Sequence, residues 1–390
     1  MRNWLLPEYI EDVLPAEAAR LESMRRTLLD LFKVHGYQFV IPPMLEYMES
    51  LTTGVGHDLD LATFKVVDQL TGRLMGVRAD MTPQVARIDA HLLNHQGVTR
   101  LCYAGSVLRT QPDGLARTRE PLQLGAELYG HSGVASDIEI QQLMVKALQN
   151  LGIAEIHIDF SHVNVFGSLV EASQLSPQLE QALFDALKTK DQAQVATMAS
   201  HLPAHVRDAL LQLPGLNGGV DVLETAAKVL PQTDAIKNAL SELKAICQAM
   251  ADVGVTCSVD LSELRGYHYH SGIVFAAYAK GFKGPLALGG RYDEVGQIFG
   301  RARAATGFSV DLRGIVTALP PATLPTAILA PALKSQPLEF QASLTEKVNA
   351  LRAEGQVVIQ EIHNASVDLV ELNCTQKLAH YASGWHVVDL

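Results

Sequence analysis

A run of twenty residues without a charged side chain, residues 314–333, most constrains what this chain can fold into. Its length and apolar character match a membrane-spanning helix, but it contains Pro320, Pro321, Pro325 and Pro331. Prolines inside a helix remove backbone hydrogen bonds and clash with the preceding turn, so a continuous spanning helix is excluded. We interpret the segment as the end of one domain, a stiff linker and the first strand of another, and we expect no membrane partner.

The linker predicts a large domain at residues 1–320 and a small one at 326–390. The chain has 390 residues, which is enough for more than one domain. Hydrophobic residues make up 48% of it and charged residues 19%, a composition that excludes a disordered chain. The net charge of -11 argues against a protein whose main task is to bind a nucleic-acid backbone.

Cysteine spacing argues against a structural zinc site or a dithiol redox motif. No two of the four cysteines form a Cys-x-x-Cys pair, since they lie at Cys102, Cys247, Cys257 and Cys374. Pro7 and Glu8 also interrupt the apolar start of the chain too early for a signal peptide. We therefore expect a cytoplasmic protein with reduced thiols.

Two β-hairpins are predicted in the first third of the chain. Apolar residues at helical spacing after Pro15 first predict a helix that ends at Gly36. Alternating strand-like residues then predict one hairpin with strands at 64–68 and 74–78, and a longer one with strands at 100–110 and 121–129.

Capping residues mark the starts of two further helices. Thr82 is of the N-cap type, and Pro83 suits a first helical residue. Ser136 and Glu139 have the spacing of a capping box, which predicts a helix that ends before Gly152.

The remaining segments suggest an antiparallel sheet interrupted by helices. Residues from about 170 to 252 are rich in Ala, Gln and Leu at helical spacing and are predicted as a helical insertion. After the linker, a strand, a helix and a second strand predict a small α/β domain. The expected strands on both sides of the linker are 257–261, 268–277, 285–288, 306–310, 326–330 and 357–362, and the expected helix is 338–354.

Gln123, Gly125 and Glu127 alternate along one predicted strand, so their side chains share a face. Amide and carboxylate groups are costly to bury without partners, and a solvated face is the simplest explanation. Gly125 between them favours a ligand instead, because a missing side chain leaves room. A carboxylate near arginines such as Arg109 suits a zwitterion, whose ammonium binds the acid and whose carboxylate binds arginine.

Other motifs in the chain give weaker signals. His268 and His270 lie two residues apart and resemble a pair of metal ligands, but no third ligand is evident, so we expect no metal. Residues 289–293, Gly-Gly-Arg-Tyr-Asp, lack the spacing of a phosphate-binding loop. No nucleophile elbow or metalloprotease motif is present, and we expect no cofactor.

In their order along the chain, these motifs resemble the catalytic core of class II aminoacyl-tRNA synthetases, and within them histidyl-tRNA synthetase. The resemblance covers most of residues 1–318 and implies an α+β fold, an antiparallel sheet flanked by helices. The matching segments are 36–46 for the first class II motif, 78–82, the hairpin 109–127 for the second motif, 265–272 and 289–293 for two histidine-specific signatures, and 306–313 for the third motif.

The resemblance implies an amino-acid pocket that is retained. The positions that match the residues holding histidine are Asp80, Arg109, Gln123, Glu127, Arg265, Tyr269, His270 and Tyr292, with His270 in place of a tyrosine.

Three departures fall on the ATP side. Gln111 stands where a glutamate reads adenine, Pro121 stands where an aromatic ring stacks on it, and Gly314 stands where an arginine binds ATP. Losing stacking costs about 1–3 kcal/mol, and losing a charge-assisted contact costs about 1.5–3 kcal/mol more.

This pattern resembles the family of regulatory subunits of ATP phosphoribosyltransferase, which are paralogues of histidyl-tRNA synthetase. The resemblance implies a dimer that joins a short-form catalytic subunit in a hetero-octamer, takes histidine as its effector and has no catalysis of its own. Residues 326–390 are short for an anticodon-binding domain and carry 4 basic against 7 acidic side chains, so no tRNA is expected. The alternatives are an enzyme that adenylates histidine for a tRNA or another acceptor, and a class II fold kept only as a dimeric scaffold.

Overall fold

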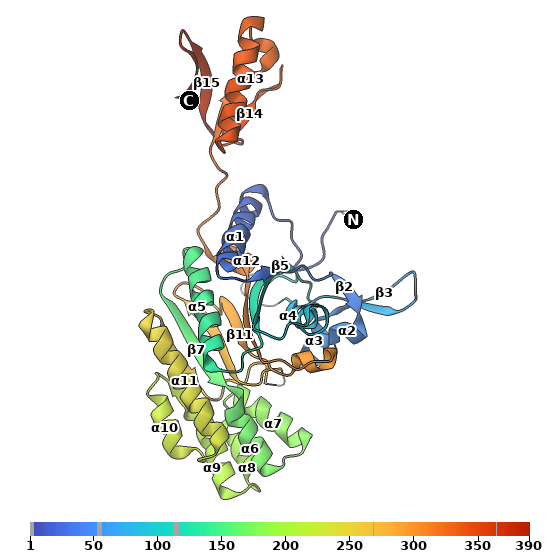
Figure 1. Ribbon diagram of the computed structural model, residues 1–390, viewed down its shortest axis with the longest axis vertical. Helices are drawn as coiled ribbons and strands as arrows, with labels where there is room; N and C mark the ends of the chain where they lie inside the picture. The colour runs from blue at the N-terminus through green and yellow to red at the C-terminus, as the bar shows by residue number, and fades with distance from the viewer. Residues whose placement is uncertain (1–3, 53–56, 113–116, 268, 364) are drawn as a thin grey trace. The chain divides into compact units, whose positions relative to one another are not determined.

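The computed structural model describes residues 4–52, 57–112, 117–267, 269–363 and 365–390. It separates into two compact units (Figure 1). The first comprises Met1–Asp12 and Leu21–Pro320, and the second comprises Val13–Arg20 and Pro321–Leu390. The division at Pro320 falls within the uncharged proline segment.

A nine-stranded sheet forms the centre of the first unit, with strand order β1-β5-β6-β12-β11-β10-β7-β9-β8. Its pairs are antiparallel except for β1 with β5 and β7 with β9. The sheet confirms the predicted class II synthetase-like α+β fold. Its strands are β1 (Gln38–Phe39), β5 (Thr99–Ser106), β6 (Leu122–Tyr129), β7 (Ile156–His162), β8 (Asn217–Gly218), β9 (Thr256–Asp260), β10 (Ile273–Ala279), β11 (Ala287–Arg291) and β12 (Ala305–Asp311).

One face of this sheet is covered by helices α1 (Pro15–Val34), α5 (Val134–Asn150) and α11 (Asp234–Asp252), of which α5 and α11 lie side by side (Figure 1). The Phe32 ring of α1 packs edge-on against Phe308 of β12, with centroids 5.9 Å apart. The predicted apolar stripe of α1 is buried at Leu21, Met24 and Leu28. Since this face is closed by helices, a ligand of the sheet has to approach from the opposite face.

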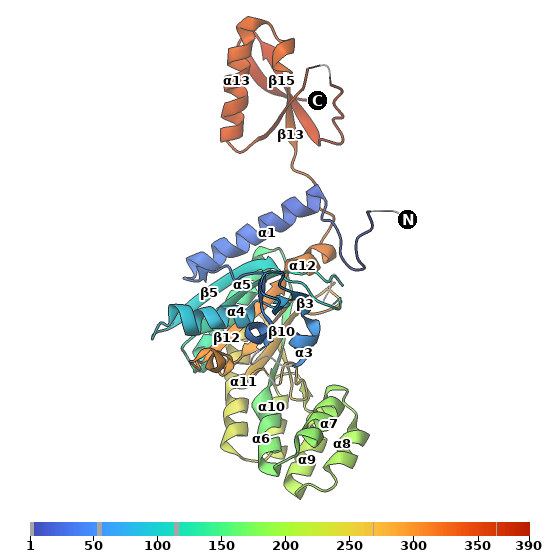
Figure 2. The same ribbon diagram turned by 90° about the vertical axis from the view of Figure 1, so that its right-hand side faces the viewer.

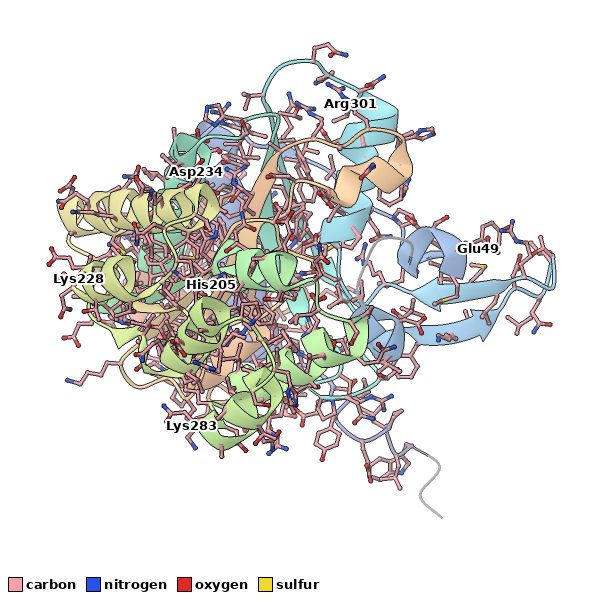
Figure 3. The ribbon with its side chains drawn as sticks, turned by 90° about the horizontal axis from the view of Figure 1, so that it is seen from below. Glu49, His205, Lys228, Asp234, Lys283 and Arg301 are labelled. Atoms are coloured by element: carbon pink, nitrogen blue, oxygen red, sulfur yellow. The ribbon has the colours of Figure 1, made fainter. Side chains whose placement is uncertain are left out.

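The helical insertion lies between β7 and β9. These strands are parallel neighbours, and parallel neighbours need a crossover connection. The first helix begins at Val163, earlier than predicted, and the smaller helices gather at one end of the sheet (Figure 2). Viewed from below, His205 and Lys228 lie in this group, away from Glu49 (Figure 3). The helices are α6 (Val163–Ser173), α7 (Pro177–Lys188), α8 (Gln192–Ala199), α9 (Ala204–Gln212) and α10 (Val222–Val229), with a 3-10 turn at Leu213–Gly215.

A three-stranded sheet of order β2-β4-β3 contains the shorter predicted hairpin. Its last strand leads into α4, which packs near the nine-stranded sheet at β6. A second short helix follows in π conformation. These elements are β2 (Leu45–Tyr47), α2 (Met48–Thr52), α3 (His57–Ala62), β3 (Phe64–Val67), β4 (Leu74–Val77), α4 (Thr82–Arg87) and the π-helix Ile88–Leu93.

The predicted capping box of α5 was wrong, because tertiary contacts use the same side chains. The N-cap of α5 is Gly133, so Ser136 and Glu139 form no capping box. The Ser136 hydroxyl accepts a hydrogen bond from Arg291 Nη2 at 2.8 Å, and Glu139 pairs with Arg100 at 2.6 Å.

The strand predicted at 268–277 begins only at Ile273, because the preceding residues turn. The amides of Tyr269 and His270 both donate to the Gly266 carbonyl at 2.8 Å. Gly266 has φ +65°, in the left-handed region that favours glycine. The chain therefore turns at Gly266 before it enters β10.

The second unit contains a four-stranded sheet of order β14-β13-β15-β16 and one long helix. Its core includes Ile328, Leu344, Val348 and Trp385. This part is the predicted small α/β domain, with an added antiparallel pair. Its elements are β13 (Ala327–Ala330), α13 (Leu338–Ala353), β14 (Val357–Gln360), β15 (Cys374–Tyr381) and β16 (Gly384–Asp389).

Within the described residues of the whole chain, no helix is both long and apolar enough to cross a membrane.

Candidate functional site

A cavity of about 200 Å³ opens on the sheet face that the helices leave uncovered. Seven of the eight predicted site residues line it: Asp80, Arg109, Gln123, Glu127, Tyr269, His270 and Tyr292. They come from β6, from the segment after β5, from the segment before α4, from the residue after β11 and from the turn before β10.

Glu127 lies at the bottom of this cavity and is only 1% exposed. Its carboxylate accepts hydrogen bonds from the hydroxyls of Tyr103 at 2.9 Å and Tyr292 at 2.5 Å, and from Thr82 at 3.3 Å. Burial raises the pKa of Glu127 to about 8, and these donors offset only part of that effect. At neutral pH the empty site therefore holds mostly the neutral acid, and a ligand cation would ionise it.

Two glycines shape the space around Glu127. A Cβ on Gly307, its partner in the β12 ladder, would collide with the Glu127 carboxylate. The space above Gly125 is filled by the Tyr103 ring, which faces it in the β5–β6 register. The prediction that Gly125 leaves room for a ligand was wrong, since it makes room for the residue that hydrogen-bonds Glu127.

Asp80 is held by Gln123 at the mouth of the cavity. Gln123 Nε2 donates to Asp80 Oδ1 at 2.9 Å, while Gln123 Oε1 accepts the Met81 amide at 2.9 Å. Asp80 Oδ1 also accepts the Thr82 amide at 2.8 Å. Thr82 is thus the first residue of α4 and not its N-cap, and its hydroxyl contributes to the cavity.

An aromatic wall closes another side of the cavity. The Tyr269 ring stacks on Tyr292, with centroids 5.3 Å apart. The buried Tyr269 hydroxyl has no hydrogen-bond partner among the described residues. Burial lowers the pKa of His270 to about 4, which keeps its imidazole neutral.

Metal binding finds no support in the part of the chain that the structure describes. No group of three or more His, Cys, Asp or Glu side chains there has the geometry to hold a metal ion. His268, the other member of the histidine pair, lies outside the described residues.

The structure places Arg265 outside this cavity. Its guanidinium lies 3.5 Å from the Glu263 carboxylate and lines a separate space of about 40 Å³ with Asp159 and Val274. The turn that begins at Gly266 separates Arg265 from Tyr269 and His270.

A second cavity of about 170 Å³ adjoins the first and shares four of its lining residues: Arg109, Gln123, Leu288 and Ser309. Pro121 and Gly314, two of the three departures on the ATP side, line this second cavity. Arg313 is used elsewhere, because its guanidinium donates to the backbone carbonyls of Glu120 and Glu11, each at 3.1 Å.

Sequence reasoning missed Tyr103 and Thr82 as members of the site. Tyr103 lies on β5, which was predicted as a strand, but its position opposite Gly125 depends on the register of the hairpin. An aromatic residue opposite a glycine in a long hairpin is the signal that could have identified it.

Comparisons with known proteins identify the family of the chain. The family model described as "Histidyl-tRNA synthetase" matches residues 9–315, and the one described as "ATP phosphoribosyltransferase subunit HisZ C-terminal domain" matches residues 325–388. A protein named ATP phosphoribosyltransferase regulatory subunit from Methylobacillus flagellatus is 63% identical over 388 residues, covering 100% of this chain and 99% of its own length. One of the same name from Cupriavidus necator is 52% identical over 386 residues, with 99% of each chain covered.

Solved structures share the fold over nearly the whole chain. The crystal structure of an ATP phosphoribosyltransferase regulatory subunit/histidyl-tRNA synthetase from Bacillus halodurans is 27% identical, has a TM-score of 0.83 and covers 97% of this chain and 98% of its own. A histidyl-tRNA synthetase from a Nostoc species, 16% identical, has a TM-score of 0.78 with 100% and 97% covered, which shows the common fold. The chain therefore belongs to the family of ATP phosphoribosyltransferase regulatory subunits, built on the histidyl-tRNA synthetase fold.

Proposed function

We propose that this chain is a cytoplasmic, non-catalytic regulatory subunit that binds histidine and joins the short-form catalytic subunit of ATP phosphoribosyltransferase. One observation carries the proposal: the amino-acid cavity holds seven of the eight predicted site residues, while the adjoining cavity has Pro121 and Gly314 where a synthetase holds ATP. Its relatives are named as regulatory subunits of ATP phosphoribosyltransferase, which supports our assignment of the chain to that enzyme complex.

The first cavity offers a partner to each end of a histidine molecule. Glu127 and Asp80 take the α-ammonium, and Arg109 takes the carboxylate. Tyr269 and His270 line the rest of the cavity and would face the imidazole of the ligand, with the His270 ring held by its Nδ1 atom at the Gly266 carbonyl, 3.1 Å away. Gln123 keeps Asp80 in place, so it acts through Asp80 and not as a separate ligand group.

The second cavity argues against adenylation. Pro121 offers no aromatic face for adenine, and Gly314 offers no cation for phosphate. Arg313 cannot substitute, since it is bonded to Glu120 and Glu11. If the chain does not adenylate histidine, a bound histidine can still act as a regulatory signal. The short, acidic C-terminal part gives no reason to expect a tRNA partner.

Histidine can inhibit a complex only if its binding free energies for the active and inactive states differ, typically by about 1–3 kcal/mol.

From the family resemblance we expect the chain, as a dimer, to form a hetero-octamer with the catalytic subunit. Mixing the two purified proteins should give one complex by light scattering, with phosphoribosyltransferase activity that falls as histidine is added. Failure to form a complex would contradict the proposal, and histidine-dependent exchange of pyrophosphate into ATP by this chain alone would identify an enzyme instead.

Histidine binding should release a proton near neutral pH. With the pKa of Glu127 raised to about 8, most of these sites are protonated at pH 7, and pairing with an ammonium requires the carboxylate. Affinity should therefore rise with pH up to about 8, and calorimetry in buffers of different ionisation enthalpy should show net proton release on histidine binding at pH 7 and less release at pH 8. Release of no proton at either pH would place the ammonium elsewhere.

A further inference from the structure

Tyr267 joins the turn before β10 to the helical insertion. Its ring packs edge-on against Phe166 of α6, with centroids 5.1 Å apart, and the ring of Phe184 of α7 lies 6.0 Å away. The Tyr267 hydroxyl donates a hydrogen bond to the carboxylate of Glu180 on α7 at 3.0 Å. Burial raises the pKa of this hydroxyl, so it keeps the proton that it donates. These contacts attach the turn to two helices of the insertion, which lie at one end of the sheet (Figure 2).

The same turn carries Tyr269 and His270, which line the amino-acid cavity. Their amides both donate to the Gly266 carbonyl, so the backbone of these two residues follows that of Gly266. Beyond them, the Ser271 amide donates to the carbonyl of the last residue of β11 at 2.8 Å. This part of the cavity wall is therefore held by the sheet on one side and by the insertion, through Tyr267, on the other.

Tyr267 is not among the described residues that line the cavity. It can affect a bound ligand only through the two residues of the turn that do line it. A change in how α6 and α7 pack around the Tyr267 ring would move this turn, because the ring and the hydroxyl are both held by these helices. The insertion thus has a direct mechanical connection to the amino-acid cavity.

We infer that Tyr267 is a positioning residue of the histidine site: it holds Tyr269 and His270 against the ligand by anchoring their turn to α6 and α7, and it thereby couples histidine binding to the packing of these helices. The inference rests on the proposed histidine site. Because such coupling is reciprocal, any change in helix packing that alters histidine affinity is matched by an equal effect of histidine on that packing.

Tyr267→Ala removes the anchor and leaves the residues that line the cavity in place. Calorimetry on the full chain should show histidine affinity lower by about fivefold or more, the lower end of typical coupling between sites. Tyr267→Phe keeps the ring and loses only the hydrogen bond to Glu180, so it should retain most of the affinity. Tyr278→Ala is the matched control, because this half-buried tyrosine of β10 is not among the residues that line the cavity, and it should leave the affinity unchanged.

Phe184→Leu changes the anchor from the side of α7 and should also weaken histidine binding. Combined with Tyr267→Ala it should cause little further loss, because both substitutions break the same contact. If Tyr267→Ala does not fold, Phe184→Leu decides the question alone.

Hydrogen exchange adds a measurement that a purely local structural role would not change. Histidine should slow amide exchange in α7 of the unmodified chain, and this response should be lost in Phe184→Leu. Unchanged histidine affinity in Tyr267→Ala or in Phe184→Leu, or α7 exchange that does not respond to histidine, would show that the inference is wrong. If histidine does not bind the unmodified chain, the proposed function is wrong instead.

Discussion

Glu127→Gln should weaken histidine binding by about a hundredfold or more while the chain keeps its fold. The substitution removes the negative charge that pairs with the ammonium, in a site only 1% exposed where water cannot replace it. The glutamine has the same shape and can still accept the hydroxyls of Tyr103 and Thr82 through its oxygen. The loss therefore reports the charge and not a collapsed cavity.

Calorimetric titration of histidine measures this effect directly, and light scattering shows whether the variant still forms the complex with the catalytic subunit. Glu139→Gln is the matched control, because Glu139 is a carboxylate of α5 that pairs with Arg100 away from the cavity. Its affinity for histidine should equal that of the unmodified chain. Equal affinity in Glu127→Gln would show that the ligand lies elsewhere.

The same variant should change how stability depends on pH. Folding raises the pKa of Glu127 to about 8, so ionising this carboxyl group costs more free energy in the folded chain than in the unfolded chain. The free energy of unfolding of the unmodified chain therefore falls as pH rises from about 5 through 8. Glutamine does not titrate, and the fall should be smaller in Glu127→Gln. Urea unfolding at pH 6 and pH 9 separates this effect from loss of the ligand.

The positions of two cavity-lining residues were predictable, because a local pattern decides them. The alternation of Gln123, Gly125 and Glu127 fixes a shared face within one strand, and the structure confirms that Gln123 and Glu127 line one cavity. The prolines after Gly314 likewise indicated the change from the first unit to the second.

Features that depend on long-range register or on a turn were not predictable in this way. Tyr103 reaches Glu127 only because β5 and β6 pair with Tyr103 opposite Gly125. Arg265 shares a motif with Tyr269, but the left-handed Gly266 turns the chain between them. Ser136 and Glu139 had the spacing of a capping box, yet Arg291 and Arg100 recruit these side chains from elsewhere in the fold.

Arg291→Met should lower the free energy of unfolding by about 3–5 kcal/mol, because it leaves the buried Asp137 without its cation. Arg291 donates to Asp137 Oδ2 at 2.8 Å, and the two side chains are only 6% and 3% exposed. Its remaining hydrogens go to Ser136, to Asp293 and to the carbonyls of His131 and Gly133. Methionine fills part of the volume but satisfies none of these acceptors.

Urea unfolding at pH 7 measures the loss of stability. Arg265→Met is the control, because Arg265 is 39% exposed and lies 3.5 Å from Glu263. We expect this control to lower the free energy of unfolding by about 1 kcal/mol or less. Adding Asp137→Asn to Arg291→Met should restore part of the stability by removing the unpaired charge. A loss below about 1 kcal/mol in the single variant would contradict the assignment. Because Tyr292 follows Arg291 in the chain and donates to Glu127, a displaced Arg291 segment should also weaken histidine binding.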